Sequence, residues 1–335
     1  MKIAVIGAGA IGSVIAGYLA EKKEDVYLVG RSPAVEAVRR SGLHISGVRG
    51  QMHVSVAMYD TLVSKPDLAI LATKTQDIEG VFGAHAAFLE GALILTTQNG
   101  IRAEQIVAHY VPQDKIISSI VMFGATYLEP GKVVHNFEGA WILGGVNGAQ
   151  AVDKAQTLRG VLEKAFTAIV SPDIQGMKYL KIFVNANNCI PAVLGVSMQE
   201  AFSDLEVSRI SVAIWKEALD IMKLSGRTLV SLPGFPVENV TRLVSLPGAE
   251  ATKIFSGIMT ALSSEPLYGS ILQSIKRGRA SEIDYINGEF VAEAKRVGTK
   301  APLNAKLVNM VHEVEKTNTF FSKDELLSAV KGLYR

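Results

Sequence analysis

Residues 2–33 read KIAVIGAGAIGSVIAGYLAEKKEDVYLVGRSP, and this stretch decides the fold. Ile3–Ile6 is a short apolar run, which predicts a buried β-strand. Residues 7–12 (GAGAIG) then match the pattern G-x-G-x-x-G, Ser13–Lys22 continues as a helix with one apolar face, and Val26–Val29 predicts a second strand. Strand, glycine turn, helix and strand form the context in which this motif binds the pyrophosphate of a dinucleotide.

Each glycine of the turn has its own physical reason. Gly7 allows the tight turn after the strand, Gly9 lets the backbone approach a pyrophosphate, and Gly12 lets the helix pack close to the strand. The free N–H groups at the start of the helix then face the phosphates. We therefore predict an α/β Rossmann-type dinucleotide-binding domain at the N-terminus. A tight turn without a ligand is the structural alternative.

The uncharged start of the chain has two other interpretations. Residues 3–20 contain no charged side chain and follow Lys2, as in a secretory signal or a membrane anchor. Glycines at this density are poor helix formers, however, and the apolar segment begins with β-branched residues. We therefore favour the nucleotide-binding turn.

Arg31 indicates which dinucleotide binds. NAD-binding versions of the motif place an acidic residue at the end of the second strand, where it bonds the ribose 2′-hydroxyl. Here that strand is followed by Gly30-Arg31-Ser32. A guanidinium group suits a 2′-phosphate, because it forms bidentate, charge-assisted hydrogen bonds. We predict NADP as the cofactor; a solvated loop arginine is the alternative.

Composition limits the classes of function. The 335 residues, 48% hydrophobic and 20% charged, are typical of a globular protein with room for two domains. A net charge of +2 gives no reason to expect nucleic acid or a membrane surface as a partner. The single cysteine, Cys189, excludes an intrachain disulfide and indicates a reducing, cytoplasmic location. The histidines lack the spacing of a zinc pair, so no metal is expected.

Two further apolar runs end at candidate cofactor residues. Residues 68–73 and 92–97 predict buried parallel strands, which are followed by Lys74 and by Gln98-Asn99-Gly100. Ligands of open α/β sheets bind at the carboxyl ends of the strands, so Lys74 and Asn99 are candidates for the cofactor site. A simple turn explains Asn99-Gly100 equally well. More strands are predicted over 116–125, 132–144 and 167–170, with a helix over 150–165.

The alternation of strands and helices stops at Ser171-Pro172-Asp173. We therefore expect an NADP-binding domain over residues 1–172 and an all-α substrate and catalytic domain over residues 173–335, with the substrate between them. The expected helices of the second domain cover 177–194, 206–224, 250–261, 267–276, 283–297 and 304–316, and 226–249 is expected to be an irregular connection.

Two stretches of the second domain contain candidate chemistry. Lys181 and Asn185 are spaced i, i+4, so they share a helix face among apolar residues. A partly desolvated lysine has a lowered pKa and suits acid–base work. An amphipathic helix with Lys178 and Lys181 in solvent is the structural alternative. In the other stretch, Ser281-x-x-Asp284 is typical of a helix cap, with Glu282 in the first turn.

The chain resembles the ketopantoate reductases (2-dehydropantoate 2-reductases) over nearly its full length. The matching motifs are, in order, the glycine turn, Lys74, QNG at 98–100, K-x-x-x-N at 181–185 and SEIDYING at 281–288, of which the last is the most specific. The resemblance implies a C-terminal domain like that of 6-phosphogluconate dehydrogenase. It also implies NADPH-dependent reduction of 2-dehydropantoate to pantoate in pantothenate and coenzyme A biosynthesis. The partner is then a small 2-keto acid, and the oligomeric state stays open, with a homodimer as one option.

The resemblance also implies roles for individual residues. Lys181 matches the proton donor of the family, and Glu282 matches its acid at the junction of cofactor and substrate. Asn99, Asn185 and Ser270 match substrate-binding positions. The implied cofactor contacts are Gly7, Ala8, Gly9, Ala10, Ile11, Gly12, Arg31, Lys74, Asn99, Ala125 and Glu282.

Two departures from the family pattern concern the substrate side. Cys189 stands where the family has a second asparagine, and Leu267 stands where it has another. A reductase of a different 2-keto acid is therefore the alternative to a ketopantoate reductase. A non-catalytic NADP-sensing module is a third interpretation, which the intact set of Lys181, Asn185 and Glu282 disfavours.

Overall fold

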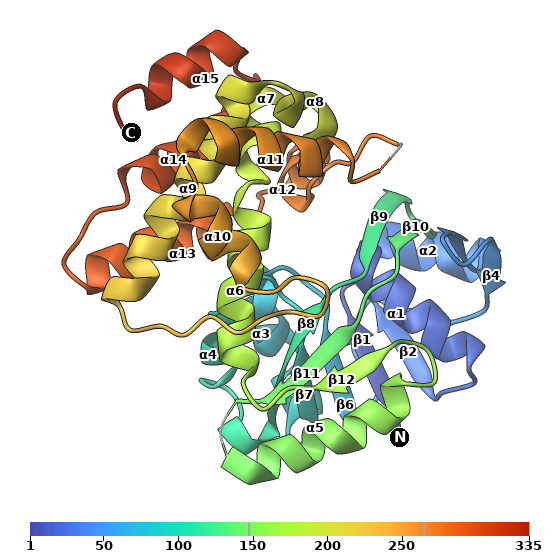
Figure 1. The fold of residues 1–335 in the computed structure, drawn as a ribbon. Helices are drawn as coiled ribbons and strands as arrows, with labels where there is room; N and C mark the ends of the chain where they lie inside the picture. Colours follow the sequence, from blue (N-terminus) through green and yellow to red (C-terminus); the bar gives the residue numbers. More distant parts are fainter. Residues whose placement is uncertain (147, 264, 335) are drawn as a thin grey trace. The chain divides into compact units, whose positions relative to one another are not determined.

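The computed structural model describes residues 1–146, 148–263 and 265–334, and the chain divides into an N-terminal unit (Met1–Gln175) and a C-terminal unit (Gly176–Arg335) (Figure 1). Strands and helices alternate in the N-terminal unit, and the C-terminal unit is helical. This confirms the predicted fold class. Within the described ranges, no helix combines the length and the apolar character that crossing a membrane requires.

The first strand, β1 (Ile3–Ile6), lies inside an eight-stranded sheet with the order β12-β11-β8-β7-β6-β1-β2-β5. All neighbours from β8 to β5 pair in parallel, whereas β11 is antiparallel to β8. The strand order reverses at β1, because β2 and β5 follow on one side and β6, β7 and β8 follow on the other. Open α/β sheets bind ligands at such a reversal. The other strands are β2 (Val26–Val29), β5 (Ala57–Tyr59), β6 (Leu68–Leu71), β7 (Leu93–Thr96), β8 (Ile116–Val121), β11 (Trp141–Gly145) and β12 (Ala168–Val170).

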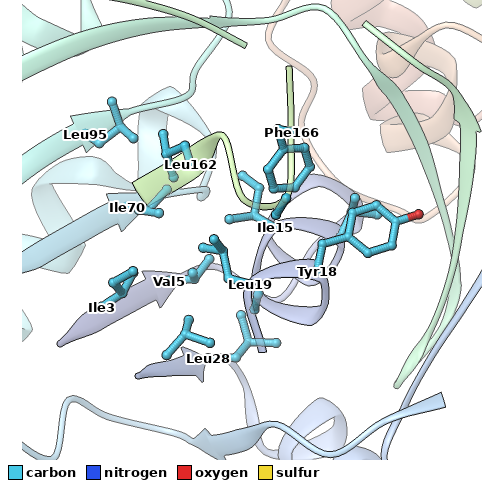
Figure 2. Close-up of a cluster of buried hydrophobic side chains, with 14 of the residues drawn as sticks. Ile3, Val5, Ile15, Tyr18, Leu19, Leu28, Ile70, Leu95, Leu162 and Phe166 are labelled. Carbon is cyan, nitrogen blue, oxygen red and sulfur yellow. The ribbon is translucent and has the colours of Figure 1, made fainter. Parts of the chain in front are cut away.

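Helices bury both faces of this sheet. Ile3 and Val5 point to one face, which α1, α2 and α5 cover, and Ala4 and Ile6 point to the other, which α3 and α4 cover. Figure 2 shows Leu19 of α1 packed among strand residues of the first face. Burial on both sides explains the continuous apolar runs. The helices are α1 (Ala10–Glu21), α2 (Ser32–Ser41), η1 (Thr75–Asp77), α3 (Ile78–Leu89), α4 (Ala103–Val107), η2 (Gln113–Lys115) and α5 (Gly148–Leu162).

A second sheet of four strands packs against α1, and it corrects two predicted strands. Its order is β4 (Met52–Val54), β3 (Leu43–Gly47), β10 (Lys132–Phe137) and β9 (Gly124–Glu129). The predicted strands 116–125 and 132–144 are each divided between the two sheets, as β8 and β9 and as β10 and β11. The chain leaves the large sheet at Met122, whose N–H donates a hydrogen bond to the carbonyl of Ala140. Gly139 packs against the backbone of Met122, and a Cβ on Gly139 would lie 2.4 Å from the Met122 carbonyl carbon.

The C-terminal unit corrects the predicted helix 177–194, which is two helices, α6 and α7. Pro191 explains the break, because its ring would clash with the carbonyl of Asn187 in a continuous helix, whereas the first turn of a new helix accepts proline. The helices are α6 (Ile174–Ala186), α7 (Cys189–Leu194), α8 (Met198–Ser203), α9 (Leu205–Leu224), α10 (Glu238–Ser245), α11 (Gly248–Thr260), α12 (Ser270–Ile275), η3 (Ile283–Tyr285), α13 (Asn287–Arg296), α14 (Pro302–Thr317) and α15 (Lys323–Val330).

The segment 226–249, expected to be irregular, also contains a helix. α10 lies between Pro236 and Pro247, and it buries Val240 and Leu243. The prolines that indicated an irregular connection stand outside the helix, where the restriction on their neighbours favours a helix boundary.

Candidate active site

The candidate cofactor residues of the N-terminal unit gather at one edge of the large sheet. The glycine turn follows β1, Arg31 follows β2, Lys74 follows β6 and Asn99 follows β7. These four strands are parallel neighbours in the order β7-β6-β1-β2. Their carboxyl ends therefore lie side by side, and the structure brings the four predicted positions together as a group.

The glycine turn is tight at two of its glycines and open at the third. Gly7 has a φ of +118°, and a Cβ there would lie 2.6 Å from the carbonyl carbon of Ala72. A Cβ at Gly12 would lie 1.9 Å from the carbonyl oxygen of Gly7. A Cβ at Gly9 would meet nothing within 4 Å. The turn is thus closed toward β6 and open at Gly9, the position predicted to face the pyrophosphate.

The start of α1 suits an anion. Gly9 occupies the N-cap position, with no side chain to bond the first N–H groups, and no acidic residue stands in the first turn. Unsatisfied N–H groups and the positive end of the helix dipole attract phosphate. Together with the open space at Gly9, this arrangement fits a dinucleotide pyrophosphate.

Gln98 connects two of the loops, and sequence reasoning did not assign it a role. Its side-chain nitrogen Nε2 donates hydrogen bonds of 2.9 Å to the carbonyl oxygens of Leu71 and Thr73, and its Oε1 accepts one from the N–H of Thr97. Gln98 is buried. It therefore fixes the loop of Asn99 against the loop of Lys74. In the sequence, the place of Gln98 in the QNG motif at 98–100 could have indicated a role for it.

The other cofactor candidates differ in exposure. Arg31 is solvent-exposed at the N-cap of α2, whereas Lys74, at the N-cap of η1, and Asn99 are partly buried. Ala125 lies apart from this edge in sequence and sheet, on β9, but it packs on the same apolar cluster as Ala8. The exposed guanidinium of Arg31 is available to a ligand.

Lys181 is the candidate acid of the C-terminal unit. It lies on α6 one turn before Asn185, and both side chains are partly buried. Burial of its ammonium group lowers the pKa of Lys181 to about 8. Lys178 is only 2% exposed, so the alternative in which both lysines reach solvent is wrong. Lys181 thus has a pKa suited to proton transfer near neutral pH.

A hydrogen-bonded group joins the start of α7, just after the helix of Asn185, to the segment that follows Glu282. Nδ2 of Asn287, at the start of α13, donates to Oδ1 of Asn304 at 3.0 Å and contacts Sγ of Cys189 at 3.7 Å. Cys189 is fully buried, and burial raises the pKa of its thiol to about 12. Cys189 therefore has a structural role, in the contact between the start of α7 and the start of α13, and its thiol is not exposed.

Ser270 and Glu282 lie next to this group. Gly269, directly before Ser270, packs on the α6–α7 junction, because a Cβ on Gly269 would lie 3.0 Å from Cγ of Asn188. Ser270 itself is exposed at the start of α12, and Glu282 is buried at the N-cap of η3. The segment of Ser270 and the helix that follows Glu282 thus each contact the α6–α7 junction, just after Asn185.

The predicted cap at Ser281 is corrected. Oγ of Ser281 accepts a hydrogen bond from the N–H of Ile283 at 3.2 Å, which closes a local turn at η3. The helix α13 begins later, at Asn287, without a side-chain cap. The predicted helix 283–297 is therefore a 3₁₀ turn followed by a helix, and Glu282 is in the turn. Among the described residues, no group of three or more His, Cys, Asp or Glu could hold a metal ion.

A Rossmann-type α/β unit with an open glycine turn, followed by a helical unit, fits the class of two-domain oxidoreductases. Two family models then cover most of the chain: "Ketopantoate reductase PanE/ApbA" matches residues 3–148, and its C-terminal counterpart matches residues 173–315. The chain belongs to the ketopantoate reductase family.

One curated relative agrees with this assignment, and two solved structures share the fold. A 2-dehydropantoate 2-reductase of Pyrococcus horikoshii is 32% identical over 94% of this chain and 98% of its own length. A solved D-mandelate dehydrogenase in complex with NADH is 25% identical, covers 95% of this chain and all of its own, and has a TM-score of 0.78. The crystal structure of a ketopantoate reductase from Ralstonia eutropha is 23% identical over 94% of this chain and 99% of its own, with a TM-score of 0.79.

Proposed function

We propose that this protein reduces 2-dehydropantoate to pantoate with NADPH, a step of pantothenate and coenzyme A biosynthesis. The observation on which the proposal depends most is Lys181, whose pKa of about 8 leaves it protonated yet ready to lose its proton near neutral pH. Membership of the ketopantoate reductase family and the name of the Pyrococcus relative support the substrate.

The N-terminal unit supplies the cofactor site in this proposal. The free N–H groups at Gly9 and the first turn of α1 bind the pyrophosphate, and the exposed guanidinium of Arg31 binds a 2′-phosphate. Lys74 and Asn99, whose loops are held together by Gln98, complete the cofactor site at the carboxyl edge of the sheet. Bound NADPH supplies the hydride, which goes to the C2 ketone of the substrate.

The C-terminal unit supplies the proton. The Lys181 ammonium donates a hydrogen bond to the ketone oxygen and transfers its proton as negative charge develops there, so the product is a neutral 2-hydroxyl group. Because this charge is largest in the transition state, the interaction raises kcat more than it tightens substrate binding. Asn185 and Ser270 hold the substrate, and Glu282 orients the substrate hydroxyl and the lysine.

A reductase of another 2-keto acid is the second candidate. Cys189 and Leu267 stand where the family has asparagines, and a relative at 25% identity is named D-mandelate dehydrogenase. The full burial of Cys189 limits its part in this difference to an indirect one, through its contact with Asn287. Leu267 is partly exposed and is the more direct position.

A panel of 2-keto acids tests the two candidates. Ketopantoate, phenylglyoxylate and pyruvate would each be assayed with NADPH and with NADH, with kcat/KM as the measurement. The highest kcat/KM for ketopantoate with NADPH is the expected result. A preference for phenylglyoxylate would replace the substrate and keep the mechanism, and binding of NADPH without turnover of any keto acid would reject the enzymatic proposal.

A further inference from the structure

His312, which no part of the proposed mechanism uses, lies between two carboxylates beside Glu282. Its Nε2 is 3.0 Å from Oδ1 of Asp284, and its Nδ1 is 3.1 Å from Oε2 of Glu315. The second carboxylate oxygen of Glu315 accepts a 2.6 Å hydrogen bond from the backbone N–H of Ser281. Ser281 and Asp284, on either side of Glu282, are therefore both hydrogen-bonded to side chains of α14.

The arrangement follows from local spacing. His312 and Glu315 are i, i+3 on α14, so their side chains share one face of the helix. Asp284 comes from η3, which packs on α14. Glu282 stands between the two attached residues, and its backbone carbonyl accepts the N–H of Tyr285. The backbone of Glu282 is thus fixed by contacts made at Ser281 and Asp284.

The protonation state of His312 decides how many of these bonds form. A neutral imidazole has one N–H and can donate to only one carboxylate, whereas an imidazolium donates to both. Partial burial lowers the pKa of His312, but the hydrogen bonds and charges of Asp284 and Glu315 outweigh burial and raise the pKa overall. Asp284 and Glu315 are the charged groups that act on it; α7, α9, α13 and α15 also pack on α14 and contribute none among the described residues.

We propose that His312, in its imidazolium form, is a positioning residue that holds the Ser281–Tyr285 turn on α14 and thereby aligns Glu282 with the substrate. The inference rests on the proposed function of Glu282. It assigns this chain a second pH-dependent group in addition to Lys181. Deprotonation of His312 releases one of the two carboxylates and loosens the turn, so the alignment is best at the acidic side of neutrality.

The variant His312→Gln tests this role, because glutamine keeps one donor and cannot become a cation. The measurement is the ratio of wild-type to variant kcat/KM for ketopantoate across pH, in which the pH dependence of Lys181 cancels. We expect a ratio of about two to five at the acidic end, typical of losing a solvent-exposed ion pair, and a ratio near one at alkaline pH. A ratio that does not change with pH would overturn the proposal.

Two controls separate positioning from general damage. His109→Gln, at an exposed histidine of the N-terminal unit, should give a ratio near one at every pH. Adding His312→Gln to Glu282→Gln should cause no further loss of kcat/KM, because His312 acts through Glu282. Independent losses that multiply in the double variant would contradict the proposal.

A readout without substrate distinguishes this inference from the proposed function. The amide proton of Ser281, followed by NMR or hydrogen exchange in the full chain, should change with the titration of His312 in the wild type and lose that change in His312→Gln. If the wild type reduces no keto acid, the proposed function fails while this titration still tests the contact. A Ser281 amide that does not respond to His312→Gln rejects the contact itself.

Discussion

The side-chain amide of Gln98 donates a 2.9 Å hydrogen bond to the backbone carbonyl of Thr73, directly before Lys74. Gln98→Ala removes this bond and also the bond from the same amide to the carbonyl of Leu71, which keeps the hydroxyl of Thr97 as a donor. We expect the free energy of unfolding to fall by about 1–3 kcal/mol and the Kd of NADPH to rise, because the Lys74 loop loses its support. Chemical denaturation and a binding titration measure these changes. Gln51→Ala, at an exposed glutamine, should alter neither value.

Gly9→Ala should separate binding from folding. Gly9 has an extended backbone conformation that alanine also adopts, and its Cβ would meet no protein atom within 4 Å. The thermal midpoint should therefore stay near the wild-type value, while the added methyl group raises the Kd of NADPH about tenfold through its contact with the pyrophosphate. Gly80→Ala, which also has open space, is the matched control for the binding measurement. Unchanged cofactor affinity in Gly9→Ala would exclude this turn as the pyrophosphate site.

Arg31→Ala tests the choice of dinucleotide. Loss of charge-assisted hydrogen bonds to a 2′-phosphate should raise the Kd of NADPH about 10–100-fold and leave the Kd of NADH unchanged. The comparison of both cofactors in one titration is the measurement. Arg40→Ala removes an exposed arginine in the last turn of α2, the helix that Arg31 precedes, and should change the Kd of NADPH little. If Arg31→Ala weakens both cofactors equally, Arg31 does not read the 2′-phosphate.

The pH profile of the reduction should reflect Lys181. The general acid must be protonated, so kcat should fall as the pH rises through about 8, the pKa of Lys181. Lys181→Ala should lower kcat by about 10²–10⁴-fold and abolish this alkaline limb. Stopped-flow measurement of the reduction with saturating NADPH reports the chemical step directly. An alkaline limb that persists in Lys181→Ala would assign the limb to another group.

Lys181→Met should lose activity yet gain stability. The pKa of Lys181 is about 8 in the folded protein against 10.5 in the unfolded chain, so between these values the unfolded chain binds more protons and the wild type gains stability as the pH rises. At pH 7 both states are charged, and the folded state bears the full penalty of the buried charge. Methionine removes it, and we expect a gain of the order of 1–3 kcal/mol at pH 7 that shrinks toward pH 10.5. Equal pH dependence of unfolding in both proteins would show that Lys181 is not desolvated.

Most of the large sheet, though not its edge strand β5, could be predicted from the sequence because burial on both faces leaves continuous apolar runs. β1 and β6 are examples, with every residue buried. The small sheet could not. In this sheet β4 has only three residues, and β3 alternates a buried residue such as Leu43 with a partly exposed one such as His44. Runs of residues that belong to two sheets, as at Met122, look like single strands in the sequence.

In the candidate site, too, features that depend on nearby residues could be predicted, whereas features that depend on distant residues could not. The roles of Gly7 and Gly12 could be predicted because the positive φ of Gly7 and the approach of Gly12 to the Gly7 carbonyl oxygen belong to the turn itself. Gln98 could not be assigned, because the carbonyls that it bonds lie 25 and 27 positions away. The burial of Lys178 was missed for a related reason: a helical lysine in an apolar segment looks exposed until the elements packed around it are known.

The carboxylate of Glu217 on α9 accepts hydrogen bonds from the N–H groups of Leu303 and Asn304, at the start of α14. α14 therefore has no cap of its own sequence, and its first turn is complete only when α9 is docked. A C-terminal fragment that begins after α9 would begin α14 with unsatisfied amides. During synthesis, the start of α14 gains these hydrogen bonds only from a residue made 86 positions earlier, so the stability of this helix end depends on the docking of α9.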